Sequence, residues 1–108
     1  MDSTTKYIHI GGYQEINPKE VIMLQADINY TILYFANGQK KIVATPLKTL
    51  ESRLVPYDFY RTHKSYLINL KCVKLFSEVT NTVQLTDNHK VIVSRRKRTQ
   101  LKIHLANI

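Results

Sequence analysis

The 108-residue sequence is poor in several residue types, and each shortage excludes a class of protein. Its single cysteine, Cys72, cannot form an internal disulfide, which agrees with a reducing compartment. Three glycines, two of them adjacent, are too few for a glycine-rich phosphate loop. No apolar run approaches the ~18–20 residues of a membrane-spanning helix, and the N-terminus lacks the apolar core of a signal peptide. We therefore expect a cytoplasmic protein.

Residue patterns typical of catalysis or metal binding are also missing. No serine lies in a nucleophile elbow, and no close pair of carboxylates marks an acid–base site. We interpret Asp27 and Asp58 as turn residues. His9, His89 and His104 are scattered without the spacing of metal ligands. The sequence predicts a protein that is not an enzyme and that needs neither a cofactor nor a metal.

Acidic residues are scarce in the second half of the chain. Residues 1–58 contain six Lys/Arg and six Asp/Glu, whereas residues 59–108 contain ten Lys/Arg and only Glu78 and Asp87. The whole net charge of +8 therefore comes from the second half. Such asymmetry indicates a surface that faces a polyanion, and nucleic acid, membrane lipid and acidic protein all satisfy this criterion.

Short segments of alternating or continuous apolar character recur between turn signals. Asn37-Gly38 is the strongest hairpin signal, and Gly11-Gly12 marks an earlier turn. The pattern predicts a mainly β fold, a sandwich or open barrel, with about eight to ten short strands and one or two short helices. Strands are expected at residues 6–10, 13–16, 21–25, 30–36, 40–44, 66–70, 73–79, 83–86 and 90–94.

Two helices are expected. The clearer one is predicted to use Thr45 as its N-cap and Pro46 as its first residue, and Pro56 ends it. A second helix is predicted over residues 95–108, where Leu101, Leu105 and Ile108 recur at helical spacing. A single helical turn is expected after Asn17 and Pro18, and residues 1–5 are expected to be a flexible N-terminus.

Residues 59–70 read Phe-Tyr-Arg-Thr-His-Lys-Ser-Tyr-Leu-Ile-Asn-Leu, with apolar anchors around a polar middle. Arg61, His63, Lys64 and Ser65 can all donate hydrogen bonds to an anion, so this middle is a candidate phosphate cradle. The alternative is that Arg61 and Lys64 are simply solvated and that His63 caps a turn. A histidine between two cations tends to stay neutral, so for His63 we favour a structural hydrogen bond over a base contact.

The densest charge is the run Arg95-Arg96-Lys97-Arg98. Adjacent cations repel one another, and cations at the start of a helix oppose its dipole. A polyphosphate backbone would reverse that cost and release counterions on binding. The alternative is a solvated helix start.

The run at residues 59–70 resembles the signature segment of the LytTR-type DNA-binding domain, the output domain of many bacterial response regulators. Residues 21–31 and 91–96 also fit this family, and the similarity extends over nearly all of residues 6–108, which we treat as one domain. The resemblance implies an elongated assembly of small antiparallel sheets. A typical regulator of this family carries a receiver domain in front, so we expect either a free-standing regulator or a fragment.

The resemblance further implies three loop contacts with DNA in place of a recognition helix. We expect Arg96 and the Tyr30–Thr31 pair to reach base edges in successive major grooves, with Lys64 over the minor groove between them. Arg95 and Arg96 would exchange roles if the strand register shifted by one residue. The candidate DNA-binding residues are Asn29, Tyr30, Thr31, Arg61, His63, Lys64, Ser65, Arg95, Arg96 and Lys97.

The residue patterns and this resemblance together predict sequence-specific binding of double-stranded DNA in bacterial transcription regulation, and the resemblance implies two copies on direct repeats. Affinity would come from Lys/Arg contacts with phosphates, and specificity from a few loop side chains. One alternative is a β-rich RNA-binding module that stacks bases on exposed tyrosines. Another is a basic surface that binds a protein or a membrane.

Overall fold

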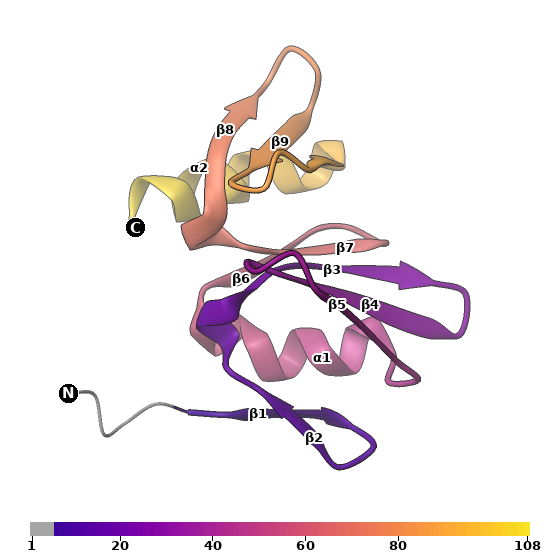
Figure 1. Ribbon diagram of the computed structural model, residues 1–108. Helices are drawn as coiled ribbons and strands as arrows, with labels where there is room; N and C mark the ends of the chain where they lie inside the picture. The colour runs from indigo at the N-terminus through magenta and orange to yellow at the C-terminus, as the bar shows by residue number, and fades with distance from the viewer. Residues whose placement is uncertain (1–5) are drawn as a thin grey trace, which may run out of the picture.

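The structure is a computed structural model, and it describes residues 6–108. The expected flexible N-terminus, residues 1–5, lies outside this range. The described chain forms ten strands in three antiparallel sheets and two short α-helices (Figure 1). The predicted mainly β fold is confirmed.

The elements follow one another with short connections. The strands are β1 (Ile8–Gly11), β2 (Gln14–Ile16), β3 (Val21–Asp27), β4 (Tyr30–Phe35), β5 (Lys40–Val43), β6 (Phe59–His63), β7 (Tyr66–Asn69), β8 (Val73–Ser77), β9 (Thr82–Leu85) and β10 (Lys90–Ile92). The α-helices are α1 (Leu47–Leu54) and α2 (Arg98–Ala106). Four 3₁₀ turns complete the list: η1 (Pro18–Glu20), η2 (Val55–Tyr57), η3 (Leu70–Cys72) and η4 (Arg95–Lys97).

The central sheet has five strands in the order β5-β4-β3-β7-β6. The hairpin β6–β7 joins the earlier strands through β7, which pairs antiparallel with β3 and places Leu24 opposite Leu67. The remaining sheets are the hairpin β1–β2 and the three-stranded sheet β10-β9-β8.

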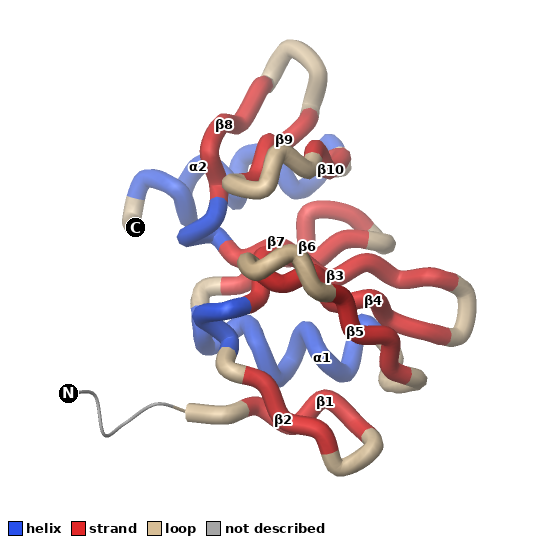
Figure 2. The backbone as a smooth tube through the Cα atoms, viewed as in Figure 1, coloured by secondary structure: helices blue, strands red, loops and turns tan. Residues whose placement is uncertain are grey.

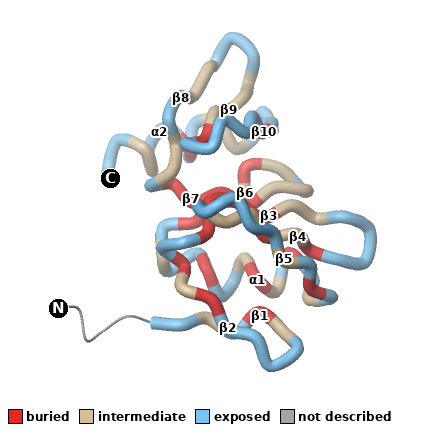
Figure 3. Tube along the Cα trace, viewed as in Figure 1, coloured by how far each residue is buried: buried red, intermediate tan, exposed pale blue. Residues whose placement is uncertain are grey.

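The central sheet separates two apolar cores, because successive side chains of a strand point to opposite faces. Leu24 and Leu67 belong to the core under α1 and β1–β2, whereas Met23 and Ile68 belong to the core under α2 and the three-stranded sheet. Figure 2 shows the resulting layers, with α1 below the central sheet and the three-stranded sheet above it. Figure 3 shows that the buried residues gather along these contacts.

The start of α1 differs from the prediction. Pro46 occupies the N-cap position and no side chain caps the helix, so the assignment of Thr45 as N-cap is wrong. The hydroxyl of Thr45 instead donates to the carbonyl oxygen of Ile10 at 2.6 Å. This bond ties the hairpin β1–β2 to the body of the domain, which explains why the hydroxyl is not available to the helix.

Two other turn signals are confirmed, whereas the turn predicted at Gly11-Gly12 is shifted by one residue, because Gly11 ends β1. Asn17 caps η1 by accepting a hydrogen bond from the Lys19 amide at 3.0 Å, with Pro18 as the first residue. Gly38 has a φ of +86° in the turn between β4 and β5. No helix within residues 6–108 is long and apolar enough to cross a membrane.

Candidate nucleic-acid interface

Two turns of the central sheet lie side by side at one end. Strands β3 and β6 both pair antiparallel with β7, so they run in the same direction and finish at the same end of the sheet. β3 leads into the turn Ile28–Asn29, and β6 leads into the turn Lys64–Ser65. The Ala26 amide donates to the Ser65 carbonyl oxygen at 2.9 Å, which holds the two turns together.

The segment between β10 and α2 reaches the same end of β6. The Ser94 amide donates to the Thr62 carbonyl oxygen at 2.8 Å, and the Val93 amide donates to the Asn81 carbonyl oxygen at 2.8 Å. η4 follows directly after Ser94. Three segments that are distant in the sequence therefore meet at one end of the molecule, on the right of Figure 1.

The first of these segments presents two of its three candidate residues. Asn29 is exposed and Tyr30 is 54% exposed, at the start of β4. Thr31 is fully buried, and its hydroxyl donates to the Thr45 carbonyl oxygen at 2.7 Å. Tyr30 and Thr31 point to opposite faces of the sheet because they are neighbours in a strand. Thr31 thus has a structural role in place of the expected DNA contact.

The second segment is a β-hairpin that presents Lys64 at its turn. Lys64 is exposed and Ser65 is half-buried, in the two-residue turn between His63 and Tyr66. The sequence pattern predicted a strand only from Tyr66 onward, but Phe59–His63 is also a strand. The segment is anchored on both sides of a presented middle, as expected.

Unlike Lys64, Arg61 does not present its side chain to solvent. Its guanidinium donates to the His63 carbonyl oxygen at 3.0 Å, to the Lys64 carbonyl oxygen, and to the Glu51 carboxylate at 2.8 Å. Its side chain is only 18% exposed. The expected anion donor is therefore occupied, and Arg61 instead fixes the backbone of the turn that carries Lys64.

His63 also holds the turn. Its Nδ1 accepts a hydrogen bond from the Ser65 amide at 3.1 Å, which requires an unprotonated Nδ1. The ring lies 5.9 Å from the ring of Tyr66. This arrangement agrees with the structural hydrogen bond that the sequence favoured for this histidine.

The third segment, η4, carries the densest charge and is held by contacts with Tyr60 of β6. Arg95 and Arg96 are exposed, whereas Lys97 is half-buried with its Nζ 5.6 Å from the centre of the Tyr60 ring. The Tyr60 hydroxyl donates to the Lys97 carbonyl oxygen at 3.1 Å. Burial raises the pKa of Tyr60, so its hydroxyl keeps the donated proton to a higher pH than an exposed tyrosine would.

Within residues 6–108, the exposed cations at this end form no ion pair with a carboxylate. Among residues 6–108, the ion pairs of Lys and Arg with carboxylates involve other side chains than Lys64, Arg95 and Arg96. By contrast, Arg98 and Lys102 lie 3.7 and 3.2 Å from Glu78. Unpaired cations attract phosphate more strongly than paired ones, because no internal ion pair must first be broken.

The sequence did not reveal which residues support this end of the molecule. Glu51 was not considered, and Tyr60 was considered only as an apolar anchor and as a candidate for base stacking. Their partners lie on other elements, and no spacing in the sequence connects them. Ile28 was not among the candidate residues either, although it stands at the tip of the first turn and is 95% exposed. Its position between two polar turn residues was the available signal.

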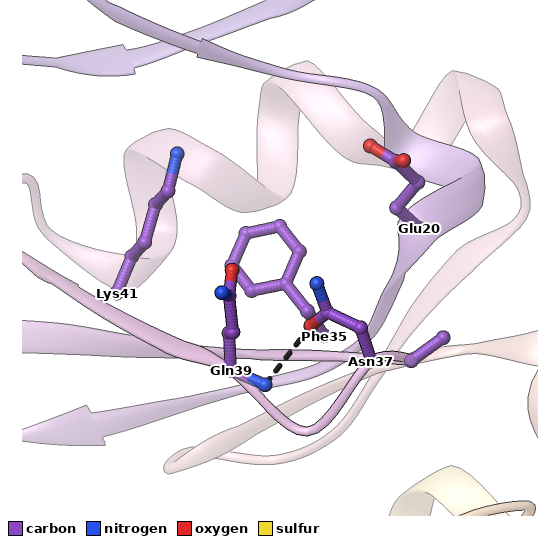
Figure 4. Close-up of a pocket in the computed structure, with 6 residues that line it drawn as sticks. Glu20, Phe35, Asn37, Gln39 and Lys41 are labelled. Atoms are coloured by element: carbon purple, nitrogen blue, oxygen red, sulfur yellow. Dashed lines mark hydrogen bonds between the residues drawn. The ribbon is translucent and has the colours of Figure 1, made fainter.

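A hollow of about 430 Å³ lies behind the first turn, where Lys48 of α1 lines it with Asn29 and Tyr30. A second hollow, of about 230 Å³, lies at the opposite end of the sheet beside the Asn37–Gly38 turn. Figure 4 shows Glu20 and Lys41 on either side of the Phe35 ring in this second hollow. Its distance from the three segments separates it from the candidate interface.

No group of three His, Cys, Asp or Glu residues within the described chain could hold a metal ion. Cys72 is half-buried, and burial raises the pKa of its thiol. A thiol of this kind is less readily ionised than a free one, so it is a weak nucleophile.

Comparisons with known proteins agree with this architecture. A solved LytTr DNA-binding domain from Bacillus cereus superimposes with a TM-score of 0.73 at 17% identity, covering 93% of this chain and 94% of that domain. The sensory transduction protein LytT of Oceanobacillus iheyensis is 30% identical over 59 residues, which is 55% of this chain. The match spans only 24% of the length of that relative.

The family comparison covers most of the described chain. Residues 12–106 match the model of the LytTr DNA-binding domain. This range includes all three segments that meet at the end of the central sheet. The chain belongs to the LytTr DNA-binding domain family.

Proposed function

We propose that this domain binds double-stranded DNA in a sequence-specific manner and regulates transcription in bacteria. The observation that carries the proposal is the meeting of three exposed segments. Two of them present cations that form no ion pair with a carboxylate of residues 6–108. Lys64, Arg95 and Arg96 are the exposed cations of this surface. Charge neutralisation of phosphates would supply most of the affinity, because counterions leave the DNA when protein cations replace them.

Specificity would come from side chains that reach base edges. Arg96 is suited to bidentate contacts with guanine in the major groove. Asn29 and Tyr30 are exposed on the neighbouring turn and can donate or accept hydrogen bonds. We assign Lys64 to the minor groove between two major-groove contacts, with Ser65, Arg95 and Lys97 on phosphates.

The dimensions of the domain support contacts with successive grooves. The molecule extends over 41 × 38 × 24 Å. One helical turn of B-DNA is about 34–36 Å long, so one domain can span it. We further propose that two copies bind direct repeats about one turn apart, on the same face of the DNA.

The structure gives less support to the RNA-binding alternative. Base stacking by a β-sheet needs aromatic rings exposed on the face of the sheet. Tyr34, Tyr60 and Tyr66 pack against the core under the three-stranded sheet. The more exposed Tyr7, Tyr13 and Tyr30 lie at strand ends and turns and form no common platform.

Selection from a random duplex pool at roughly 150 mM salt tests the proposal, since weak electrostatic binding is suppressed there. We expect a short motif, repeated at one-turn spacing. A variant with Lys64, Arg95 and Arg96 all changed to Ala should lose binding. A matched variant with Lys40, Lys74 and Lys90 changed to Ala lowers the net charge equally, from +8 to +5, and should retain it.

Three results would argue against the proposal. If no motif were recovered, the basic second half of the chain would be only a general surface for polyanions. Equal losses in the two triple variants would show that total charge, rather than its position, governs binding. Tighter binding of single-stranded RNA than of the selected duplex would favour the RNA alternative.

A further inference from the structure

Ile28 occupies an unusual position at the tip of the first turn. Asp27 pairs with Tyr30, which leaves Ile28 and Asn29 as a two-residue hairpin turn. The side chain of Ile28 is 95% exposed, although burial of an isoleucine normally stabilises a fold. Ile28 belongs to neither apolar core, so its side chain does not stabilise the fold by burial.

The backbone at Ile28 is also strained. Its φ is +52°, in the left-handed region that a β-branched residue rarely adopts. Asn81, Asn88 and Asp58 also have positive φ, but Asn and Asp tolerate this region. The φ of Asn29 is not positive, so the turn has the form in which glycine is preferred at the first central position. Folding alone therefore favours glycine at position 28.

The surroundings of Ile28 indicate what kind of ligand it would meet. Residues 26–31 contain no cation, and Asp27 adds a negative charge, so no charged side chain of this turn attracts phosphates. The turn is nevertheless held beside Lys64–Ser65 by the bond from the Ala26 amide to the Ser65 carbonyl oxygen. Contacts of the Lys64–Ser65 turn with the duplex would therefore bring the apolar tip at Ile28 against it.

We propose that Ile28 packs against the 5-methyl group of a thymine in the major groove and so specifies one base pair. The thymine methyl is the main apolar group on a base edge, and an aliphatic side chain is its natural partner. This inference rests on the proposed DNA-binding function. The proposal gives Ile28 a role in base specificity. Without such a role, the exposure and the backbone strain of this residue would bring no advantage.

The experiment uses the duplex selected from the random pool, with each thymine replaced in turn by uracil, which differs only by the missing methyl group. At one thymine, we expect wild-type affinity to fall about fourfold, the value of one buried methyl group. Ile28→Gly should bind the thymine duplex about as weakly as the wild type binds the uracil duplex. In that variant, uracil at the same position should cause no further loss.

Three companion measurements separate this role from a structural one. Ile28→Gly should unfold at the same or a higher temperature than the wild type, because glycine relieves the backbone strain. Ile28→Val, which keeps a branched side chain, should keep most of the thymine preference. Tyr13→Gly relieves a similar strain at another exposed tip, where φ is +63°, and should leave the thymine preference unchanged.

The inference fails if no thymine of the motif responds to uracil, or if the response persists in Ile28→Gly. In either case the selected motif itself would still support DNA binding. If no motif were recovered, the proposed function would fail and this inference with it. The two failures are therefore distinguishable.

Discussion

Arg61 Nη1 lies 2.8 Å from Glu51 Oε1 and thereby connects α1 to the turn that presents Lys64. Both side chains are largely shielded from solvent, at 18% and 30% exposure. The remaining nitrogens of the guanidinium hold carbonyl oxygens of the turn. The position of Lys64 thus depends on a carboxylate that is not among the candidate DNA-binding residues.

Removal of that carboxylate should affect both stability and binding. We expect Glu51→Ala to lower the free energy of unfolding by about 1 kcal/mol, since the pair is partly exposed. It should also weaken DNA binding, because the turn loses part of its anchor. Denaturant unfolding and a duplex titration measure the two effects. Glu15→Ala, at an exposed position on β2, is the control, and equal effects of the two variants would contradict the assigned role.

Arg96→Ala should lose about 1–3 kcal/mol of binding free energy and relax the preference at one base pair. Arg95→Ala should weaken all duplexes alike and reduce the salt slope by about 1, as expected of a phosphate contact. Titration of each variant with selected and scrambled duplexes at several salt concentrations measures these effects. If Arg96→Ala weakened both duplexes equally, Arg95 would become the candidate base reader.

Thr31 provides a test of the correction that the structure makes. Thr31→Val keeps the shape of the side chain but removes the hydroxyl that donates to the Thr45 carbonyl oxygen. We expect a loss of about 1 kcal/mol in the free energy of unfolding and no change in base preference. Thr31→Ser, which keeps the donor, is the matched variant for the hydrogen bond. An altered selected motif in Thr31→Val would restore Thr31 as a DNA contact.

Gly11 should tolerate no side chain. A Cβ at this position would lie 2.4 Å from the Thr45 hydroxyl oxygen, and its φ is +118°. Gly11→Ala should therefore destabilise the domain by more than the ~1–2 kcal/mol of left-handed strain alone. Gly38→Ala, at a φ of +86° with open space around it, is the control for strain without a clash. Thermal unfolding compares the two, and equal losses would contradict the close approach of β1 to Thr45.

Burial of Tyr60 predicts a loss of stability at high pH. Its raised pKa means that the folded state holds the phenolic proton more tightly than the unfolded state. This contribution is fully present below the unfolded pKa of about 10 and is lost as pH rises through the higher folded value. Tyr34 and Cys72, whose pKa values burial also raises, act in the same direction.

Tyr60→Phe should show less of this alkaline loss than the wild type. At neutral pH the variant should be less stable by about 0.5–1.5 kcal/mol, because the Lys97 carbonyl oxygen loses its donor. Melting temperatures between pH 8 and pH 11 measure both effects. Profiles of identical shape would show that the Tyr60 proton is not coupled to folding.

Local signals predicted much of the fold, and tertiary contacts explain the rest. Asn37-Gly38 and Asn17-Pro18 were sufficient to predict their turns, because the side-chain hydrogen bonds that stabilise these turns join residues only two positions apart. Thr45 followed the N-cap pattern equally well, but the carbonyl oxygen of Ile10, 35 residues earlier, takes its hydroxyl. No local pattern could reveal that competition.

For the candidate interface too, local signals predicted some residues correctly, and tertiary contacts explain the others. Lys64, Arg95 and Arg96 were predicted from charge, and they are exposed. Arg61 has the same chemistry, but its burial depends on Glu51, which folding brings close. The strand was correctly predicted to begin at Tyr30, and the alternation of side chains in a strand puts Tyr30 and Thr31 on opposite faces. The resemblance, which paired the two residues as DNA contacts, takes no account of that alternation.

The pairing of β3 with β7 has a consequence for how the domain folds. Leu24 and Leu67 are 43 residues apart, and their strands must meet before the turns at Ile28 and Lys64 become neighbours. Contacts of such long sequence separation form slowly, because a large loop must close first. The isolated β6–β7 hairpin is too small to be stable alone. The proposed recognition by neighbouring turns would therefore be a property of the completed chain, and no short fragment of it should reproduce the full surface.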